Sequence, residues 1–362
     1  MKQIHLKVDE NLHTDLRVKC AKLDTSMQEY LTNLLVKDLK LEKKELNQHK
    51  FQFIDLFAGV GGIRIPFDEL GGECVLGSEI DKYAKITYQS YFKDIPQGDI
   101  SKIQPCEIDN FDILVGGFPC QPFSQAGHRK GFHDTRGTLF FEVEKILRCK
   151  TPKAFLLENV KGLKGHDKGN TFRVIKESLE SMGYYVTEKV LAAKDFGLPQ
   201  NRERIYIVGF WEEEDFNRFN FPEATNEPTK LGKILEKNVD EKYTISDRLW
   251  AGHQRRKKEH AKKGNGFGFG MFNEDSTYTN TISARYYKDG SEILIEQKGK
   301  NPRKLTPLEA ARLQGFPDEL VYSAQKAGVS DTQLYKQFGN AVPVNVVRNI
   351  AQNMIKALFP NK

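Results

Sequence analysis

The spacing of apolar residues divides the chain into two parts with different patterns. Residues 2–8 alternate between polar and apolar side chains, which is the period of a strand with one buried face. Asp9 then precedes a helical stripe, and Thr25 or Ser26 can cap a second helix. The stripe of the first helix consists of Leu12, Leu16, Cys20 and Leu23. Residues 1–45 are therefore expected to form a small β-α-α module that needs a partner surface to bury its apolar face.

From Phe51 onward, apolar runs of strand length alternate with amphipathic stretches of helix length. This alternation predicts a doubly wound, Rossmann-like, mostly parallel α/β sheet. The expected strands lie within 51–59, 74–80, 111–117, 153–160 and 204–210, and the expected helices lie within 139–149, 172–183 and 344–358.

The alternation stops in a segment with two prolines near residues 220–230. Residues 231–302 appear irregular, basic and glycine-rich, so we expect a smaller irregular domain there that contains β-structure. The sequence therefore indicates a catalytic domain over 46–225, a second domain over 226–322 and a C-terminal segment, 323–362, that returns to the first domain.

Charge and cysteine content narrow the classes of protein. The net charge is +6, and residues 231–304 alone hold 16 Lys and Arg against 10 Asp and Glu, which suits a surface that binds phosphates. The five cysteines include no C-x-x-C pair, which argues against a disulfide framework and against a zinc site, so no metal is expected. No secretory signal or membrane-length apolar run is visible, and a cytoplasmic location is expected.

A glycine-rich turn at the end of the first large strand suggests a nucleoside site. The sequence DLFAGVGG, 55–62, lets the backbone approach a ligand closely, although such a turn alone fits many cofactors or only a tight turn. Glu79 ends the next strand and Asp99 follows a later turn, and together they could hold a ribose and an adenine amine. Taken singly, each acid could equally be a helix cap or an exposed loop residue.

Three further motifs follow strands of the same sheet. GGFPCQPFS, 116–124, holds Cys120 in a loop with two prolines, where a cysteine is poorly explained as core packing. LLENV, 156–160, places Glu158 at a strand end, where partial burial can raise its pKa and make it a proton donor. QNRERIYIVG, 200–209, puts Arg202 and Arg204 on one face of a strand, as phosphate or carbonyl ligands or as a surface salt-bridge pair.

These motifs, in this order, resemble those of the bacterial DNA cytosine-5-methyltransferase family. The resemblance extends over residues 53–360 and includes RKLTPLEAARLQGFP, 303–317, and QFGNAVPVNVV, 337–347. It implies S-adenosylmethionine as cofactor and duplex DNA as substrate, with a flipped cytosine methylated at carbon 5. Residues 1–45 resemble ribbon-helix-helix DNA-binding domains, although a docking or dimerisation arm without a DNA role fits them equally.

The resemblance also implies a role for individual residues. Cys120 would attack carbon 6 of the base, Glu158 would protonate the ring nitrogen, and Arg204 would bind the carbonyl oxygen while Arg202 supports the backbone. Phe57 would pack on adenine, and Asn340 would brace the cofactor turn. Ile80 departs from the family pattern, since several relatives carry an aromatic residue there. The expected cofactor contacts are Phe57, Gly59, Gly61, Glu79, Ile80, Asp99, Pro119 and Asn340.

The contacts to DNA are expected in two places. Residues 121–136 resemble the family's mobile loop, which closes over the flipped base, and residues 231–302 occupy the target-recognition position. Segments 264–272 and 281–295 resemble those of relatives that methylate CCNGG, CCWGG and CCGG sites. The candidate residues are Gln121, Ser124, Arg136, Arg255, Arg256, Arg285 and Lys288.

Two alternatives stay open at this stage. A tRNA cytosine-5 methyltransferase would share the catalytic motifs, although the basic insertion favours duplex DNA. A regulator that binds DNA through the N-terminal module would need no catalysis, although the catalytic residue types are all present. A restriction-modification system with a companion endonuclease is also expected, with a monomer in catalysis and a possible dimer through residues 1–45.

Overall fold

A computed structural model of the chain describes residues 9–22, 27, 50–119, 139–225, 227–264, 266 and 268–360. The chain separates into two compact units, Met1–His49 and Lys50–Lys362. In the first unit, helix α1 (Glu10–Lys22) begins where expected, because the Leu12 N–H donates to Asp9 Oδ1 at 2.9 Å. Leu12 is 48% exposed. The expected strand at 2–8 and most of the second helix lie outside the described residues.

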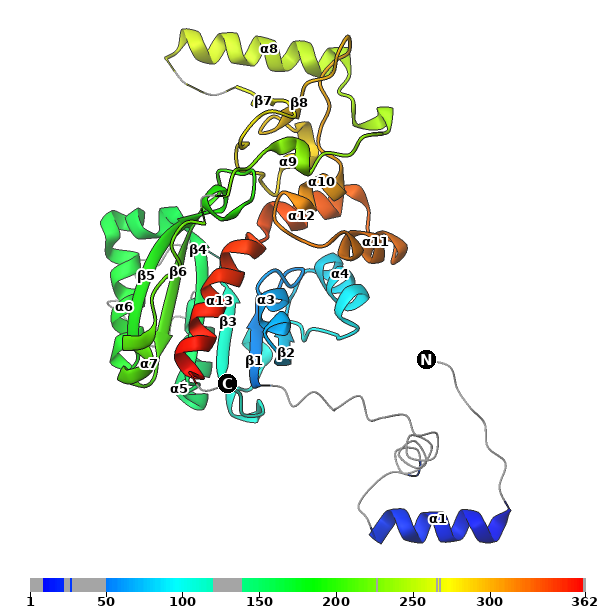
Figure 1. The fold of residues 1–362 in the computed structure, drawn as a ribbon, viewed down its shortest axis with the longest axis vertical. Helices are drawn as coiled ribbons and strands as arrows, with labels where there is room; N and C mark the ends of the chain where they lie inside the picture. The colour runs from blue at the N-terminus through cyan, green and yellow to red at the C-terminus, as the bar shows by residue number, and fades with distance from the viewer. Residues whose placement is uncertain are drawn as a thin grey trace. The chain divides into compact units, whose positions relative to one another are not determined.

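The second unit is built around a six-stranded sheet (Figure 1). Its strand order is β2-β1-β3-β4-β6-β5, and β6 pairs antiparallel with both neighbours. The fold class predicted from the apolar spacing is therefore confirmed. The strands are β1 (Phe51–Leu56), β2 (Gly72–Ser78), β3 (Ile113–Gly117), β4 (Ala154–Val160), β5 (Tyr185–Ala192) and β6 (Glu203–Phe210).

Helices cover both faces of this sheet. On one face, α3 (Arg64–Glu69) and α13 (Val344–Leu358) pack on apolar side chains of β1, β4 and β6. On the other face, α5 (Leu139–Lys150) and α6 (Asn170–Ser181) bury residues such as Val143 and Ile175. Helix α4 (Lys82–Phe92) follows β2, and α7 (Glu213–Arg218) follows β6. Figure 1 shows α13, the last helix, lying along the sheet beside β3 and β1.

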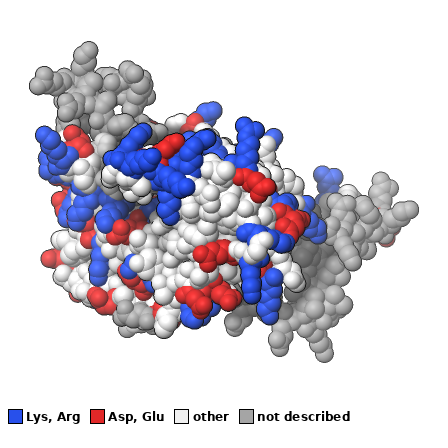
Figure 2. All heavy atoms as spheres, turned by 90° about the horizontal axis from the view of Figure 1, so that it is seen from above, with Lys and Arg blue, Asp and Glu red and all other residues white. Residues whose placement is uncertain are grey.

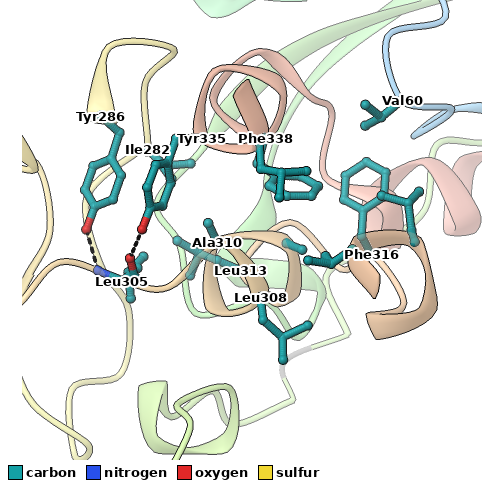
Figure 3. Packing of buried hydrophobic residues seen from close by; sticks show 14 of the residues in the cluster. Val60, Ile282, Tyr286, Leu305, Leu308, Ala310, Leu313, Phe316, Tyr335 and Phe338 are labelled. Carbon is teal, nitrogen blue, oxygen red and sulfur yellow. Dashed lines mark hydrogen bonds between the residues drawn. The ribbon is translucent and has the colours of Figure 1, made fainter. Parts of the chain in front are cut away.

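A further hydrophobic core lies outside the sheet and joins the basic insertion, residues 231–302, to the helices that follow it (Figure 3). Tyr286 Oη accepts a hydrogen bond from the Leu305 N–H at 2.8 Å, and the Tyr335 hydroxyl donates to the Leu305 carbonyl. Val60 of the glycine-rich turn belongs to the same cluster, so this core extends to the carboxyl end of β1. Its elements are β7 (Met271–Phe272), α9 (Tyr286–Asp289), β8 (Leu294–Ile295), α10 (Pro307–Arg312), α11 (Asp318–Lys326) and α12 (Asp331–Asn340).

Two expectations about secondary structure need correction or completion. The segment 231–302 is not uniformly irregular, because it contains the 16-residue helix α8 (Asp247–Lys262). That helix buries only His253, so it lacks the apolar stripe that sequence reasoning relies on. Strand β5 was also missed, because its middle residues are polar and only partly buried.

The expectation of no disulfide is wrong for one pair of cysteines. Cys106 and Cys149 form a disulfide, with a Cα–Cα distance of 5.8 Å. Cys106 lies in the 3₁₀ turn η2 (Pro105–Glu107), which packs against α5 and so brings two distant positions together. Sequence spacing alone does not reveal such a pair. In the described part of the chain, no helix is long and apolar enough to cross a membrane.

Candidate active site

The glycine-rich turn after β1 has the backbone geometry of a close-approach site. Phe57, Gly59 and Gly61 all have positive φ, at 55°, 55° and 82°. A Cβ at Gly61 would lie 2.2 Å from the Phe92 ring, so this position needs glycine for space as well as for conformation. The Gly59 N–H donates to Glu79 Oε2 at 2.7 Å, so the acid expected to bind a ribose also fixes the turn.

The residues expected to bind the nucleoside lie along adjacent segments. The backbone of Gln97 pairs with Gly77 and Glu79 at the end of β2, which places the Asp99 segment beside Glu79 and Ile80. Hydrogen bonds from Ser101 hold the pKa of Asp99 below its usual range, so the group is an anionic acceptor. Ile80, the residue after Glu79, is 73% exposed and offers an apolar surface at the end of β2.

Helix α12 braces this region through residues that the sequence analysis did not select. Lys336 Nζ lies 2.8 Å from Asp81 Oδ2, and Asp81 caps α4. The Thr87 hydroxyl donates to Gln337 Oε1 at 2.9 Å. Asn340, expected to brace the turn, is the exposed last residue of α12. Lys336 and Gln337 therefore tie α12 to α4 and to its capping residue.

The end of β3 leads directly to the position of the expected nucleophile. Pro119 is exposed after Phe118, and the next residue, Cys120, lies outside the described residues, as do Gln121, Ser124 and Arg136. The buried Asn159 Nδ2 donates to the Phe118 carbonyl at 2.8 Å, which fixes the start of that segment against the end of β4. Only Glu158 of the ENV motif was expected to have a role, although Asn159 stands in the same motif.

Glu158 and Arg204 form a buried ion pair across β4 and β6. Arg204 Nε lies 3.1 Å from Glu158 Oε1, with the side chains 14% and 10% exposed. Burial raises the pKa of Glu158, and the charges of Arg204 and Arg202 oppose the shift. A Cβ at Gly117 of β3 would lie 3.1 Å from Glu158 Oε2, so glycine there leaves room for the carboxylate. A carboxyl group that can hold a proton at a sheet edge suits general acid chemistry.

Arg202 has a different position from Arg204. It precedes β6, is only 1% exposed, and its guanidinium donates to three carbonyls. These belong to Ile282 at 3.0 Å, Gly339 at 3.0 Å and Ala341 at 2.7 Å. Gly339 is itself tightly packed, since a Cβ there would lie 2.2 Å from the Ser283 carbonyl carbon. Arg202 therefore joins the basic insertion, the end of α12 and the sheet.

The residues of the basic insertion that are expected to contact DNA differ in how strongly other side chains of the protein already hold them. Arg256 Nη2 lies 3.0 Å from Asp289 Oδ2 and 2.9 Å from His253 Nδ1, so its charge is largely compensated. Arg255 lies 3.7 Å from Glu259 and is 76% exposed. Arg285 and Lys288 are exposed at α9.

The comparisons with known proteins fit this arrangement. The sequence model of the family described as C-5 cytosine-specific DNA methylase matches residues 51–356. Type II methyltransferase M.DsaV of Dactylococcopsis salina is 57% identical over 316 residues, which cover 87% of this chain and 87% of that protein. Type II methyltransferase M.SsoII of Shigella sonnei is 59% identical over 312 residues, which cover 85% of this chain and 81% of that protein.

Solved structures share the fold at lower sequence identity. The Dnmt2 methyltransferase of S. pombe superposes with a TM-score of 0.70 and 21% identity, covering 85% of this chain and 99% of that one. The six-stranded, mostly parallel sheet with helices on both faces is thus the fold of a class of α/β methyltransferases. Within that class, the chain belongs to the C-5 cytosine-specific DNA methylases.

The residues present fit the cofactor of this family. A nucleoside needs close backbone approach, acceptors for ribose hydroxyls and an apolar surface for the base. The positive-φ turn, the paired carboxylates Glu79 and Asp99, and the exposed Ile80 supply these at one edge of the sheet.

Proposed function

We propose that this enzyme methylates carbon 5 of one cytosine within a short duplex DNA site, through a covalent adduct with Cys120. The observation that carries this proposal is the buried Glu158–Arg204 pair at the end of β4. It lies beside Gly117, at the end of the strand that leads to Cys120. A nucleophile, a proton donor and a carbonyl ligand would thus converge on one pyrimidine ring.

Each side chain contributes one part of the chemistry. The Cys120 thiolate adds to carbon 6 of the ring while the protonated Glu158 donates to the ring nitrogen, which makes carbon 5 electron-rich. Arg204 binds the carbonyl oxygen of the base and keeps Glu158 oriented. When bound, S-adenosylmethionine supplies the methyl group. Loss of the carbon 5 proton to a base then breaks the carbon–sulfur bond and restores the thiolate.

The remaining expected residues serve cofactor binding and base access. Phe57 and Ile80 face the adenine, Glu79 and Asp99 hold ribose and adenine polar groups, and Gly59, Gly61, Pro119 and Asn340 line the rest of the site. The target base must leave the helix, at a cost of a few kcal/mol. Gln121, Ser124 and Arg136 belong to the segment proposed to close over it.

Residues 226–322 are proposed as the target-recognition domain, with 46–225 and 323–362 forming the catalytic domain. The proposed target is the inner cytosine of a CCNGG, CCWGG or CCGG site, supported by the resemblance of segments 264–272 and 281–295. Arg255, Arg285 and Lys288 are exposed and suit contacts with guanine or phosphate. Arg256 suits a supporting role, because Asp289 and His253 already hold it.

We place the enzyme in the cytoplasm, within a restriction-modification system whose endonuclease cuts the same site. A regulatory role for residues 1–45 is a second candidate function. It is favoured by the separate unit Met1–His49, which lies outside the matched range 51–356. In that case, the module would bind DNA as a dimer.

Bisulfite sequencing of DNA from cells that express the protein tests the activity and the site together. We expect conversion-resistant cytosines at one position of one short sequence. Incubating the protein and labelled cofactor with either duplex DNA or tRNA distinguishes a DNA methyltransferase from a tRNA methyltransferase. We expect label to enter the duplex DNA and not the tRNA. Duplex binding without any methyl transfer by the intact protein would instead support the regulator.

A further inference from the structure

Helix α8 has one face that packs on the protein and one that does not. Ser246 caps it through the Leu249 N–H at 3.3 Å. On the packed face, His253 is buried and its Nε2 lies 3.1 Å from the Asp289 carbonyl oxygen. Trp250 stacks edge-on against Phe269 at 4.9 Å between ring centroids. These contacts hold the helix on the rest of the insertion and fix which side faces outward.

The outward side carries a basic stripe. We define it by its four cations, each exposed, which follow one another at spacings of seven, three and four residues: Arg248, Arg255, Lys258 and Lys262. At about 100° per residue, these spacings place all four within one quarter of the helix circumference. Ala251, between the first two, lies on the same side and leaves the stripe unobstructed.

The stripe keeps most of its positive charge. Its nearest acid on the helix, Glu259, lies 3.7 Å from Arg255, where both side chains are more than half exposed. Asp247 is engaged by Asn301 Nδ2 at 2.6 Å. Figure 2 looks down on the molecule from the side where Figure 1 shows α8, and Lys and Arg side chains gather on the upper left part of that face.

The dimensions of the stripe fit a DNA strand. Arg248 and Lys262 are 14 residues apart, or about 21 Å along a helix. One strand carries a phosphate every ~3.4 Å along the duplex axis, so a stripe of this length is long enough to reach several phosphates. A row of cations without amide or hydroxyl side chains among them suits phosphate contacts better than the reading of base edges.

We propose that this basic stripe binds the phosphate backbone of duplex DNA that flanks the recognised base pairs, and so sets affinity without setting specificity. The inference rests on the proposed function, because it takes the methylated duplex as the occupant. It assigns α8 a role distinct from that of α9, where Arg285 and Lys288 remain candidates for base contacts.

The test replaces the stripe by neutral residues of similar helix propensity, as R248Q/R255Q/K258Q/K262Q. A matched control, K145Q/R148Q/R173Q/K176Q, removes the same charge from α5 and α6. A second variant, R248K/R255K, keeps the charge and changes only its geometry. Circular dichroism melts show that each variant is folded.

Binding to a duplex of about 30 base pairs centred on the methylated site is measured between 50 and 200 mM salt. Four lost phosphate contacts reduce the salt slope by about 3.6, so the wild type should lose roughly a hundredfold more affinity than the stripe variant across this range. The control and the lysine variant should keep the wild-type slope. With a duplex of about 12 base pairs, which lacks the flanking phosphates, the salt slopes of the wild type and the stripe variant should be nearly the same.

The stripe variant should methylate the same target sequence as the wild type, but with a raised KM for DNA at about 50 mM salt, because its phosphate contacts are lost. A wild-type salt slope in that variant would overturn the proposal, and so would a changed target sequence, which would make the stripe a reader of bases. If the wild type methylates no duplex, the proposed function fails. The salt dependence of duplex binding still tests whether the stripe contacts phosphates.

Discussion

Asp55 gives the structure a measurable consequence outside catalysis. This residue is the last but one of β1, two positions before Phe57 of the glycine-rich turn, and it is 1% exposed. Neither carboxylate oxygen has a hydrogen-bond partner among the described residues. Arg64, whose charge opposes the raised pKa of Asp55, is committed to Asp68 at 2.9 Å and to Asp94 at 2.8 Å. We predict that Asp55→Asn stabilises the protein at neutral pH.

The magnitude follows from the proton that Asp55 holds. Burial raises the pKa of Asp55 from 3.8 to about 8. Between pH 3.8 and about 8, Asp55 carries a proton in the folded state that it has lost in the unfolded chain. The free energy of unfolding therefore falls as pH rises through this range. Each pH unit in this range lowers the free energy of unfolding by about 1.36 kcal/mol, so the protein is about 4 kcal/mol less stable at pH 7 than below pH 3.8. Asparagine does not titrate, so the variant lacks this dependence.

Urea unfolding followed by circular dichroism at pH 4, 5.5, 7 and 8.5 measures the effect. The stability difference between variant and wild type should shift in favour of the variant by about 4 kcal/mol between pH 4 and pH 7. The exposed Asp109→Asn serves as the control and should show little change. The reasoning is refuted if the difference in unfolding free energy between wild type and D55N changes by less than about 1 kcal/mol across this pH range.

Three other substitutions address the site and its support. Wild-type activity should fall as pH rises through the raised pKa of Glu158, and Glu158→Gln should lower kcat by about 10²–10⁴ and lack this fall; an unchanged pH profile would argue against a proton donor there. Arg202→Met leaves three carbonyls unpaired and should cost about 3–5 kcal/mol in urea unfolding. Cys106→Ser should cost about 2–4 kcal/mol without reductant and nothing with it, because the disulfide closes a 43-residue separation.

Much of the sheet could be predicted because its central strands are mostly apolar and buried. β3 is a continuous apolar run, and β1 and β4 interrupt theirs with only a few polar residues, such as Gln52 and Glu158. β5 lies at the sheet edge with partly exposed polar residues, and its pattern is too weak to separate from a loop. Helix α8 was missed because it is polar on almost every side and depends on a few contacts, such as Trp250 with Phe269.

The candidate site could be located because motifs at the carboxyl ends of parallel strands meet at one edge. What the sequence could not provide were contacts between distant positions. Arg202 reaches carbonyls 80, 137 and 139 residues away, and Asn159 reaches Phe118, 41 residues away. The Cys106–Cys149 pair depends in the same way on the packing of η2 against α5.

The covalent role of Cys120 is tested most directly with a duplex that carries 5-fluorocytosine at the methylated position. Fluorine cannot leave as a cation, so the account predicts a stable, denaturant-resistant complex that forms only with S-adenosylmethionine present. Peptide mapping should place the cross-link on Cys120, and Cys120→Ser should form none. A wild-type enzyme that methylates the ordinary duplex but never becomes trapped on the fluorinated one, or that is trapped at another residue, would contradict the account.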